Sequence, residues 1–191
     1  MSYKKVEGIK KLVALGLPTP KTIFINNVEE QLNELNNFLL DKELVMVRSD
    51  HPSQSTHCPR VLKCTRYEAK SFIKQLNSQG FMAIVQEHVP LNNRYSGNIL
   101  VLSDSFIIES MSGGPVSKLN RDGVVHEHVV IKEGRVVKRQ GRQVIPLNEL
   151  QSIVNKVKGL PVKYHILEFS SGPDWFYFWH ARKDLTSKVL E

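Results

Sequence analysis

A chain of 191 residues with 41% hydrophobic and 24% charged residues has an ordinary globular composition and can bury a sizeable core. Its 26 Lys and Arg against 19 Asp and Glu give a net charge of +7, which favours anionic partners such as nucleotides, nucleic acid or acidic metabolites. No apolar run is long enough to cross a bilayer, the start MSYKKVEGIKK lacks the apolar core of a secretory signal, and two cysteines provide no disulfide framework. We therefore expect a cytoplasmic protein without a membrane segment.

The first half of the chain alternates between helical and strand patterns. A helix is expected over residues 6–15, where Gly16 caps it and two prolines prevent its continuation. Asn27 and Glu30 resemble a capping box that opens a second helix, whose apolar stripe consists of Val28, Leu32, Leu35 and Leu39. A third helix is expected over residues 67–78, and strands over 22–25, 44–48, 60–65 and 82–87.

The second half is mostly β-structure. Strands separated by polar or glycine turns are expected over residues 97–102, 105–111, 124–132 and 135–138. A helix is expected over residues 147–157, because its apolar residues recur at helical spacing. The pattern predicts an α+β fold with antiparallel sheets and flanking helices, organised as two lobes, 1–90 and 91–191, that share a cleft suited to a small ligand.

The chain closes on a predicted hairpin, EFSSGPDWFYFWHAR. Gly172-Pro173-Asp174-Trp175 suits a tight turn between strands 164–169 and 175–181. The register then sets Glu168 opposite Trp179, within one residue of His180. Simple alternation places four side chains on one face: Phe176, Phe178, His180 and Arg182. A carboxylate, an imidazole and a guanidinium at one end of a hairpin could hold a metal ion and a polyphosphate, or could form a cross-strand ion pair.

Two further segments contain groups suited to phosphate or to metal. Residues 47–58, VRSDHPSQSTHC, combine Arg48 with hydroxyls and backbone N–H groups that phosphate oxygens can use, although an ordinary polar surface loop has the same composition. The spacing of Cys58 and Cys64, with His57 beside the first, does not match a structural zinc site. In residues 107–115, IIESMSGGP, Glu109 precedes two glycines. Its carboxylate could be a hard oxygen ligand for Mg²⁺, or it could be a solvated glutamate beside a turn.

Three other segments are less specific. IVQEHVP, residues 84–90, is a strand whose backbone, as an edge of the sheet, could pair with an adenine. His126 and His128 lie on one face of a predicted strand, without an obvious third metal ligand. The basic hairpin at 132–142 could bind nucleic-acid phosphates, but it lacks interleaved aromatic residues and also fits a solvated basic face.

Taken in order, these segments resemble the ATP-grasp nucleotide-binding domain of pyruvate phosphate dikinase and phosphoenolpyruvate synthase. VEGIKKLVALGLPTP is similar to the family helix that opens with Gly-Gly-Lys and runs into GLPVP, although the two glycines are absent. VRSD is similar to the family's VRSS, and VQEHVP to the strand beside the adenine. ILEF, a turn and YFWHAR resemble the closing hairpin that ends in YILQAR, whereas SGGPVS replaces the family's GLGE.

The resemblance implies ATP and Mg²⁺ as cofactors and assigns roles residue by residue. Lys5 (with Lys4 as the alternative), Arg48 and Arg182 would neutralise phosphates, and Gln86 and Glu87 would border the adenine. Glu109 and Glu168 would hold the metal. His180 stands in place of a glutamine, and as a ligand it would favour a softer ion such as Mn²⁺ or would contact phosphate directly.

Two functions fit these expectations. The first is a free-standing Mg-ATP enzyme that transfers a phosphoryl group to, or ligates, an acceptor that a partner protein could carry. The chain has no Thr-Ser-His segment of the kind that carries the swivelling histidine in the full dikinases. The second is a degenerate, non-catalytic module that binds nucleotide or RNA.

Overall fold

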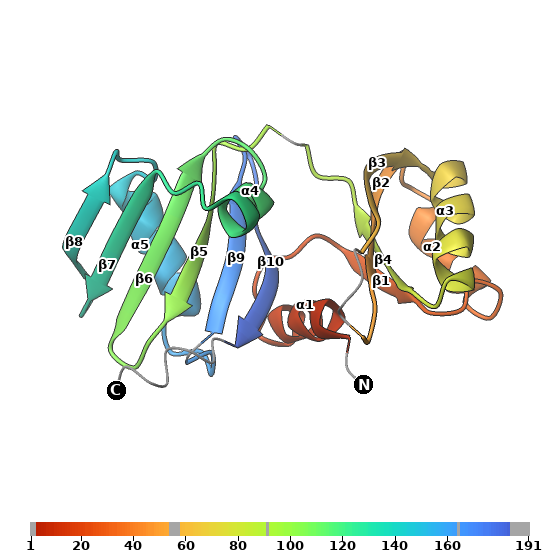
Figure 1. Ribbon diagram of the computed structural model, residues 1–191, viewed down its shortest axis with the longest axis horizontal. Coiled ribbons are helices and arrows are strands. Elements are labelled where there is room, and N and C mark those ends of the chain that lie inside the picture. Colours follow the sequence, from red (N-terminus) through yellow and green to blue (C-terminus); the bar gives the residue numbers. More distant parts are fainter. Residues whose placement is uncertain (1–2, 54–57, 91, 164, 184–191) are drawn as a thin grey trace. The chain divides into compact units, whose positions relative to one another are not determined.

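The computed structural model describes residues 3–53, 58–90, 92–163 and 165–183 (Figure 1). Within them lie five helices and ten strands. In chain order they are α1 (Lys4–Ala14), β1 (Thr22–Ile25), α2 (Leu32–Leu39), β2 (Leu44–Asp50), β3 (Arg60–Thr65), α3 (Arg66–Ser78), β4 (Met82–Glu87), β5 (Tyr95–Val101), β6 (Ser105–Ser112), α4 (Val116–Asp122), β7 (Glu127–Lys132), β8 (Arg135–Gly141), α5 (Leu147–Val157), β9 (His165–Ser171) and β10 (Phe176–Lys183). In the predicted polar loop, residues 54–57 lie outside the described residues, as does Tyr164 at the start of a predicted strand.

The chain divides into two compact units. The first comprises residues 3–7 and 19–89, and the second comprises residues 8–18 and 90–183. The first turn of α1 therefore belongs to one unit and the rest of the helix to the other. Among the described residues, no helix is both long enough and apolar enough to cross a membrane.

The first unit is a four-stranded antiparallel sheet in the order β1-β4-β2-β3. Figure 1 shows α2 and α3 on the same side of this sheet. Leu35 of α2 and Ile73 of α3 are fully buried in one core with Val45, Val47 and Val85 of the sheet. Since side chains alternate along a strand, the residues between these valines lie on the other face.

A buried carboxylate holds the N-terminus of α1 in the first unit. Asp50, only 3% exposed, accepts hydrogen bonds at Oδ2 from the backbone N–H groups of Lys5 (2.8 Å) and Val6 (3.1 Å). Its Oδ1 accepts a third from the N–H of His51 (3.0 Å). The first N–H groups of a helix lack partners within the helix, and a carboxylate satisfies them and complements the helix dipole.

The second unit is a six-stranded antiparallel sheet in the order β10-β9-β5-β6-β7-β8. Its core lies on one face, where Leu150, Ile153, Val154 and Val157 of α5 pack with Leu12 and Leu17 and with alternate residues of the strands. Tyr95 is among these buried residues; burial, together with a hydrogen bond from its hydroxyl to Glu149, raises the pKa of Tyr95 to about 12. Figure 1 shows α4 and α5 on opposite faces of the sheet.

The predicted α+β class, with antiparallel sheets and flanking helices, is confirmed. Gly16 ends α1 as predicted, in the left-handed conformation (φ 68°), with the Leu17 N–H bonded to Leu12 O. The helix expected to open at Asn27 begins instead at Leu32. Half of the predicted capping box forms: Asn27 Oδ1 accepts from the Glu30 N–H (3.4 Å), but the Asn27 N–H donates to the side chain of Gln31 (3.3 Å) rather than to that of Glu30.

One helix was missed. The segment predicted as a turn after residue 111 contains α4, and β7 begins at Glu127 rather than at 124. This seven-residue helix has only one buried side chain, Leu119, so it has no apolar periodicity for a sequence pattern to detect.

We predict that Asp50→Ala lowers the free energy of unfolding by about 1–2 kcal/mol, because it leaves the N–H groups of Lys5 and Val6 without their acceptor. Denaturant unfolding of the variant and the wild type measures the change. Asp41→Ala is the control: its exposed carboxylate forms a surface ion pair with neighbouring Lys42, so this change should leave stability nearly unaltered. Equal stability of the two variants would contradict the capping role.

Candidate functional site

The register of the second sheet aligns a row of polar residues on the face away from α5. Residues directly opposed in an antiparallel pair share a face. From β10 across to β7 the opposed residues are His180, Glu168, Asn98, Glu109 and His128, and we call them the polar row. The two carboxylates predicted as metal ligands therefore flank Asn98 on adjacent strands.

A β-bulge produces this alignment in the closing hairpin. The turn closes as predicted, with the Gly172 N–H donating to Trp175 O (2.9 Å), and Phe178 pairs with Phe169. The register then shifts between Phe178 and His180, so that His180, not Trp179, stands opposite Glu168. An extra residue in one strand reverses the alternation of side chains.

The expectation that four alternate residues of this strand share one face is therefore wrong. Phe178 packs in the core with Phe169 and Phe176, whereas His180 and Arg182 lie on the face of Glu168. His180 Nδ1 and Arg182 Nε lie 3.8 and 3.9 Å from Glu168 Oε1. Carboxylate, imidazole and guanidinium thus meet at this end of the hairpin.

The short helix α4 contributes a fourth polar group. Asn120 donates from Nδ2 to Glu168 Oε1 (2.9 Å) and accepts at Oδ1 from Asn98 Nδ2 (2.7 Å). Asn98 is 8% exposed, and its carbonyl oxygen Oδ1 is buried without a hydrogen-bond partner in the described structure. A buried carbonyl oxygen without a donor costs free energy, which a bound cation would offset.

The chemistry of this face suits a hard divalent cation. Adjacent strands are about 4.8 Å apart, so the Cα atoms of Glu109 and Glu168 are about 10 Å apart with Asn98 between them. Carboxylate and amide oxygens are the ligands that Mg²⁺ prefers. Among the described residues, no group of three or more His, Cys, Asp or Glu side chains is placed to hold a metal ion.

In the first unit, two of the residues expected to bind nucleotide touch each other. Arg48 Nη1 donates to Gln86 Oε1 (3.2 Å), and Gln86 Nε2 donates to Thr22 Oγ1 (3.0 Å). They lie on the face away from α2 and α3, with Gln86 1% exposed. Glu87 points to the opposite face, where its Oε1 accepts from the Lys21 N–H (2.9 Å). The expected edge backbone is wrong, because β4 lies between β1 and β2 and pairs with both.

Lys5 lies at the same end of β2 as Arg48. Its Nζ donates to the carbonyl of Ser49 (2.9 Å), one residue beyond Arg48. Lys4, the alternative phosphate lysine, begins α1 and is exposed. His126, expected on the face of His128, precedes β7, and its Nδ1 lies 3.1 Å from the N–H of Ser112.

Sequence reasoning missed Asn98 and Asn120. A signal existed for Asn98, because a two-residue turn at Ser103-Asp104 between the predicted strands sets it opposite Glu109. The actual hairpin has this register, with Leu102 N–H bonded to Ser105 O (2.9 Å). Asn120 had no such signal, since it depends on a helix that the pattern does not show.

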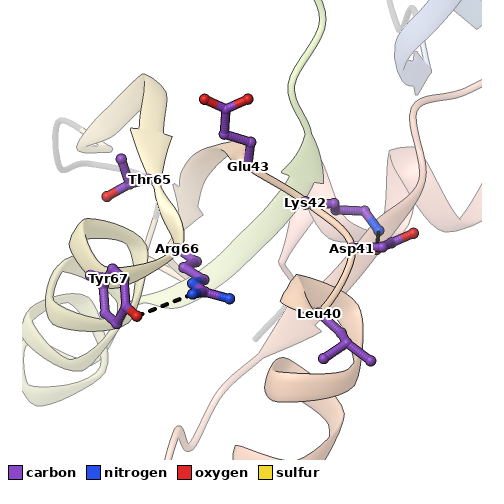
Figure 2. Close-up of a pocket in the computed structure, with 7 residues that line it drawn as sticks. All are labelled: Leu40, Asp41, Lys42, Glu43, Thr65, Arg66 and Tyr67. Carbon is purple, nitrogen blue, oxygen red and sulfur yellow. Dashed lines mark hydrogen bonds and ion pairs between the residues drawn. The ribbon is translucent and has the colours of Figure 1, made fainter.

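Pockets within the units lie away from these residues. One pocket, of about 460 Å³, lies in the first unit. In it the Arg66 guanidinium donates to the Tyr67 hydroxyl (3.1 Å), and Leu40 lies across from this pair (Figure 2). Another, of about 300 Å³, lies in the second unit beside the last turn of α5. None of the expected site residues lines either pocket.

Solved structures with the same arrangement of elements include an ATP-grasp ligase. The RiPP-associated ATP-grasp ligase of Chryseobacterium gregarium, in complex with ADP and a leader and core peptide, matches with a TM-score of 0.51 at 13% identity over 93% of this chain and 50% of that chain. This chain has an ATP-grasp-like fold. D-alanyl-alanine synthetase A of Vibrio cholerae O1 biovar eltor str. N16961 matches with a TM-score of 0.55 at 10% identity, over 95% of this chain and 55% of that chain.

A third structure is similar over most of its own length. ACD1 of Ca. Korarchaeum cryptofilum, in complex with coenzyme A, has a TM-score of 0.58 at 13% identity, over 92% of this chain and 89% of that chain. By contrast, this chain spans about half the length of the ligase and synthetase structures. No protein-family model and no curated protein matches the sequence.

These similarities confirm the ATP-grasp part of the sequence resemblance. The pyruvate phosphate dikinase and phosphoenolpyruvate synthase type stays a prediction. The roles of the individual residues also stay predictions, because identities of 10–14% show the fold alone.

We predict that Gly8→Ala destabilises the protein, although alanine normally stabilises a helix relative to glycine. A Cβ at Gly8 would lie 2.3 Å from Cδ2 of His180 and 2.4 Å from the carbonyl oxygen of Ala181, and the latter is backbone that cannot rotate away. Thermal unfolding should show a lower midpoint for Gly8→Ala. A higher midpoint would contradict the close packing of Gly8 against His180 and Ala181.

Proposed function

We propose that this chain binds ATP together with a divalent cation and uses it to phosphorylate or ligate an acceptor. The observation that carries the proposal is the polar row, where two carboxylates flank a buried amide carbonyl that has no donor in the described structure. Such a set of oxygens suits a hard divalent cation, which would bind together with the phosphates of a nucleotide. The ATP-grasp-like fold supports ATP as the nucleotide.

Glu168, Asn98 and Glu109 would hold the cation through their side-chain oxygens. Mg²⁺ is the expected ion, and Mn²⁺ fits if the imidazole of His180 joins the set. When bound, the cation would neutralise charge that develops on the phosphate oxygens. Asn120 would have to give up its hydrogen bond to Glu168 Oε1, which would release that oxygen for the cation. Its bond to Asn98 involves Nδ2 and leaves Asn98 Oδ1 available.

The remaining residues would bind and orient the nucleotide. Arg182, half-exposed beside Glu168, would contact the transferring phosphoryl group, and His180 would donate a hydrogen bond to it or carry a proton. In the first unit, Lys5 and Arg48 would neutralise further phosphate charge. Gln86 would border the base, whereas the side chain of Glu87 lies on the opposite face of the sheet. Catalysis would come from positioning and charge stabilisation rather than from covalent chemistry of the protein.

The acceptor is the open part of the proposal. The Chryseobacterium ligase was solved with ADP and a peptide, so peptides are the first acceptor class to assay. An acceptor carried on a partner protein is the second class. Incubation with ATP, metal and a candidate acceptor should release ADP or AMP only when the acceptor is present.

We predict that ATP with Mg²⁺ or Mn²⁺ raises the midpoint of thermal unfolding by several degrees. Ligand at 100 times its dissociation constant stabilises by about 2.7 kcal/mol, and ATP without metal should do much less. Arg182→Ala should lose most of the metal-dependent shift, because it removes a phosphate contact. The matched control is Arg135→Ala, an exposed arginine at the start of β8, which should keep the shift.

Two outcomes would contradict the proposal. One is the absence of any shift with nucleotide and metal. The other is an equal shift with and without metal, which would mean that the polar row does not bind a cation. Steeply salt-dependent binding of oligonucleotides in either case would instead indicate a nucleic-acid-binding module.

A further inference from the structure

A lysine and a histidine form a close pair on the second unit, away from the polar row. Lys11, in the last turn of α1, has its Nζ 2.6 Å from Nε2 of His165, the first residue of β9. His165 has the alternation of Leu167 and Phe169, which belong to the core face. The pair therefore lies on the opposite side of the sheet from Glu168.

The contact of the second ring nitrogen determines the tautomer of His165. His165 Nδ1 lies 2.9 Å from the carbonyl oxygen of Lys163. A carbonyl can only accept, so Nδ1 carries the hydrogen and Nε2 presents its lone pair to the amine. Lys11 donates to Nε2, and the imidazole is placed to take a proton from it.

The surroundings of Lys11 favour the neutral amine. Burial, and then the positive charge of Lys183, lower the pKa of Lys11. Lys183 lies opposite His165 in the β9–β10 register, so two lysines and a histidine share this corner. Lys11 has no carboxylate partner within the described part of the chain.

An activated nucleophile has a base within hydrogen-bond reach and a third group that orients the base. Here Lys11 is the nucleophile, His165 is the base, and the carbonyl of Lys163 orients the imidazole. We propose that Lys11 is a site of covalent acylation by an anionic acyl donor, such as an acyl phosphate. Lys11 is half-buried, not sealed, so a small donor can reach it. The positive charge of Lys183 would draw an anionic donor to this corner.

The step balances without a further reactant. The lone pair of Lys11 Nζ attacks the acyl carbon, an N–C bond forms, and the C–O bond to phosphate breaks, so phosphate leaves with that electron pair. The proton lost from Nζ passes to His165 Nε2 and then to water or to the phosphate. The product is a neutral amide, which can no longer be protonated beside Lys183. This inference does not depend on nucleotide binding.

The test uses the full chain with acetyl phosphate as the probe and peptide mass spectrometry to follow acetylation of each lysine. The reference is Lys156, which, like Lys11, lies in the last turn of a helix in the second unit, but is exposed. Lys11 should be acetylated roughly tenfold faster than Lys156 because it has a paired base. Equal or slower acetylation of Lys11 would overturn the proposal.

His165→Gln separates base catalysis from a structural role. A glutamine oxygen can still accept the hydrogen bond from Lys11, but it cannot take the proton. In a variant that unfolds at the wild-type temperature, the rate at Lys11 should fall to that of Lys156. An unchanged rate would show that His165 is not the base.

Lys183→Ser tests the preference for an anionic donor. A neutral reagent, the N-hydroxysuccinimide ester of acetic acid, reports the reactivity of the amine without electrostatic attraction. The ratio of acetyl phosphate to neutral-ester labelling at Lys11 should fall severalfold in Lys183→Ser. An unchanged ratio would contradict the role of Lys183 in attracting the donor.

Discussion

The candidate site depends on the antiparallel register of the six-stranded sheet. Side chains alternate with a period of two, so a slip of one residue in any strand would move its contribution to the core face. Asn98 illustrates this dependence, because the register sets it opposite both Glu109 of β6 and Glu168 of β9. The same constraint places Phe169, beside Glu168, in the core. Packing of the core and alignment of the polar row are thus set by one register.

The bulge at Trp179 extends this register to the edge strand. Without it, Phe178 and His180 would share a face, and the imidazole would enter the core. With it, Phe178 is fully buried and His180 stands opposite Glu168. At the free edge of β10, the Phe178 N–H donates to Pro18 O (2.8 Å) within the second unit. A bulge that redirects side chains beside a functional site is a recurring feature of β-sheets.

The helix α4, whose Asn120 contacts the polar row, is flanked on both sides by glycines with positive φ. Gly113 and Gly114 before it and Gly123 after it all have φ near 65°. Such conformations suit glycine and strain other residues. These glycines let the chain turn back over the sheet, where Asn120 reaches both Asn98 and Glu168.

Much of this fold could be predicted from sequence because its long elements have clear periodicity. α5 was predicted to the residue, since Leu150, Ile153, Val154 and Val157 recur at helical spacing and all are buried. The closing turn was predicted from its Gly-Pro-Asp sequence. The bulge was not, because nothing local distinguishes Trp179 from its neighbours, and only the burial of Phe178 against the core decides which residue is extra. The role of Asp50 and the Lys11–His165 pair could not be predicted because each depends on residues distant in sequence. The helix α4 was missed because it has one buried side chain and no apolar periodicity.

The most direct test of the central claim locates the cation. In the presence of ATP, Mn²⁺ broadens the amide NMR signals of nearby residues, and Glu168→Gln removes one of its ligands. We predict that broadening is strongest at Asn98, Glu109 and Glu168, declines along β5 toward Val101, and weakens markedly in Glu168→Gln. The exposed Glu133→Gln serves as the matched control and should broaden like the wild type. Broadening centred elsewhere, or unchanged in Glu168→Gln, would contradict a cation site on the polar row.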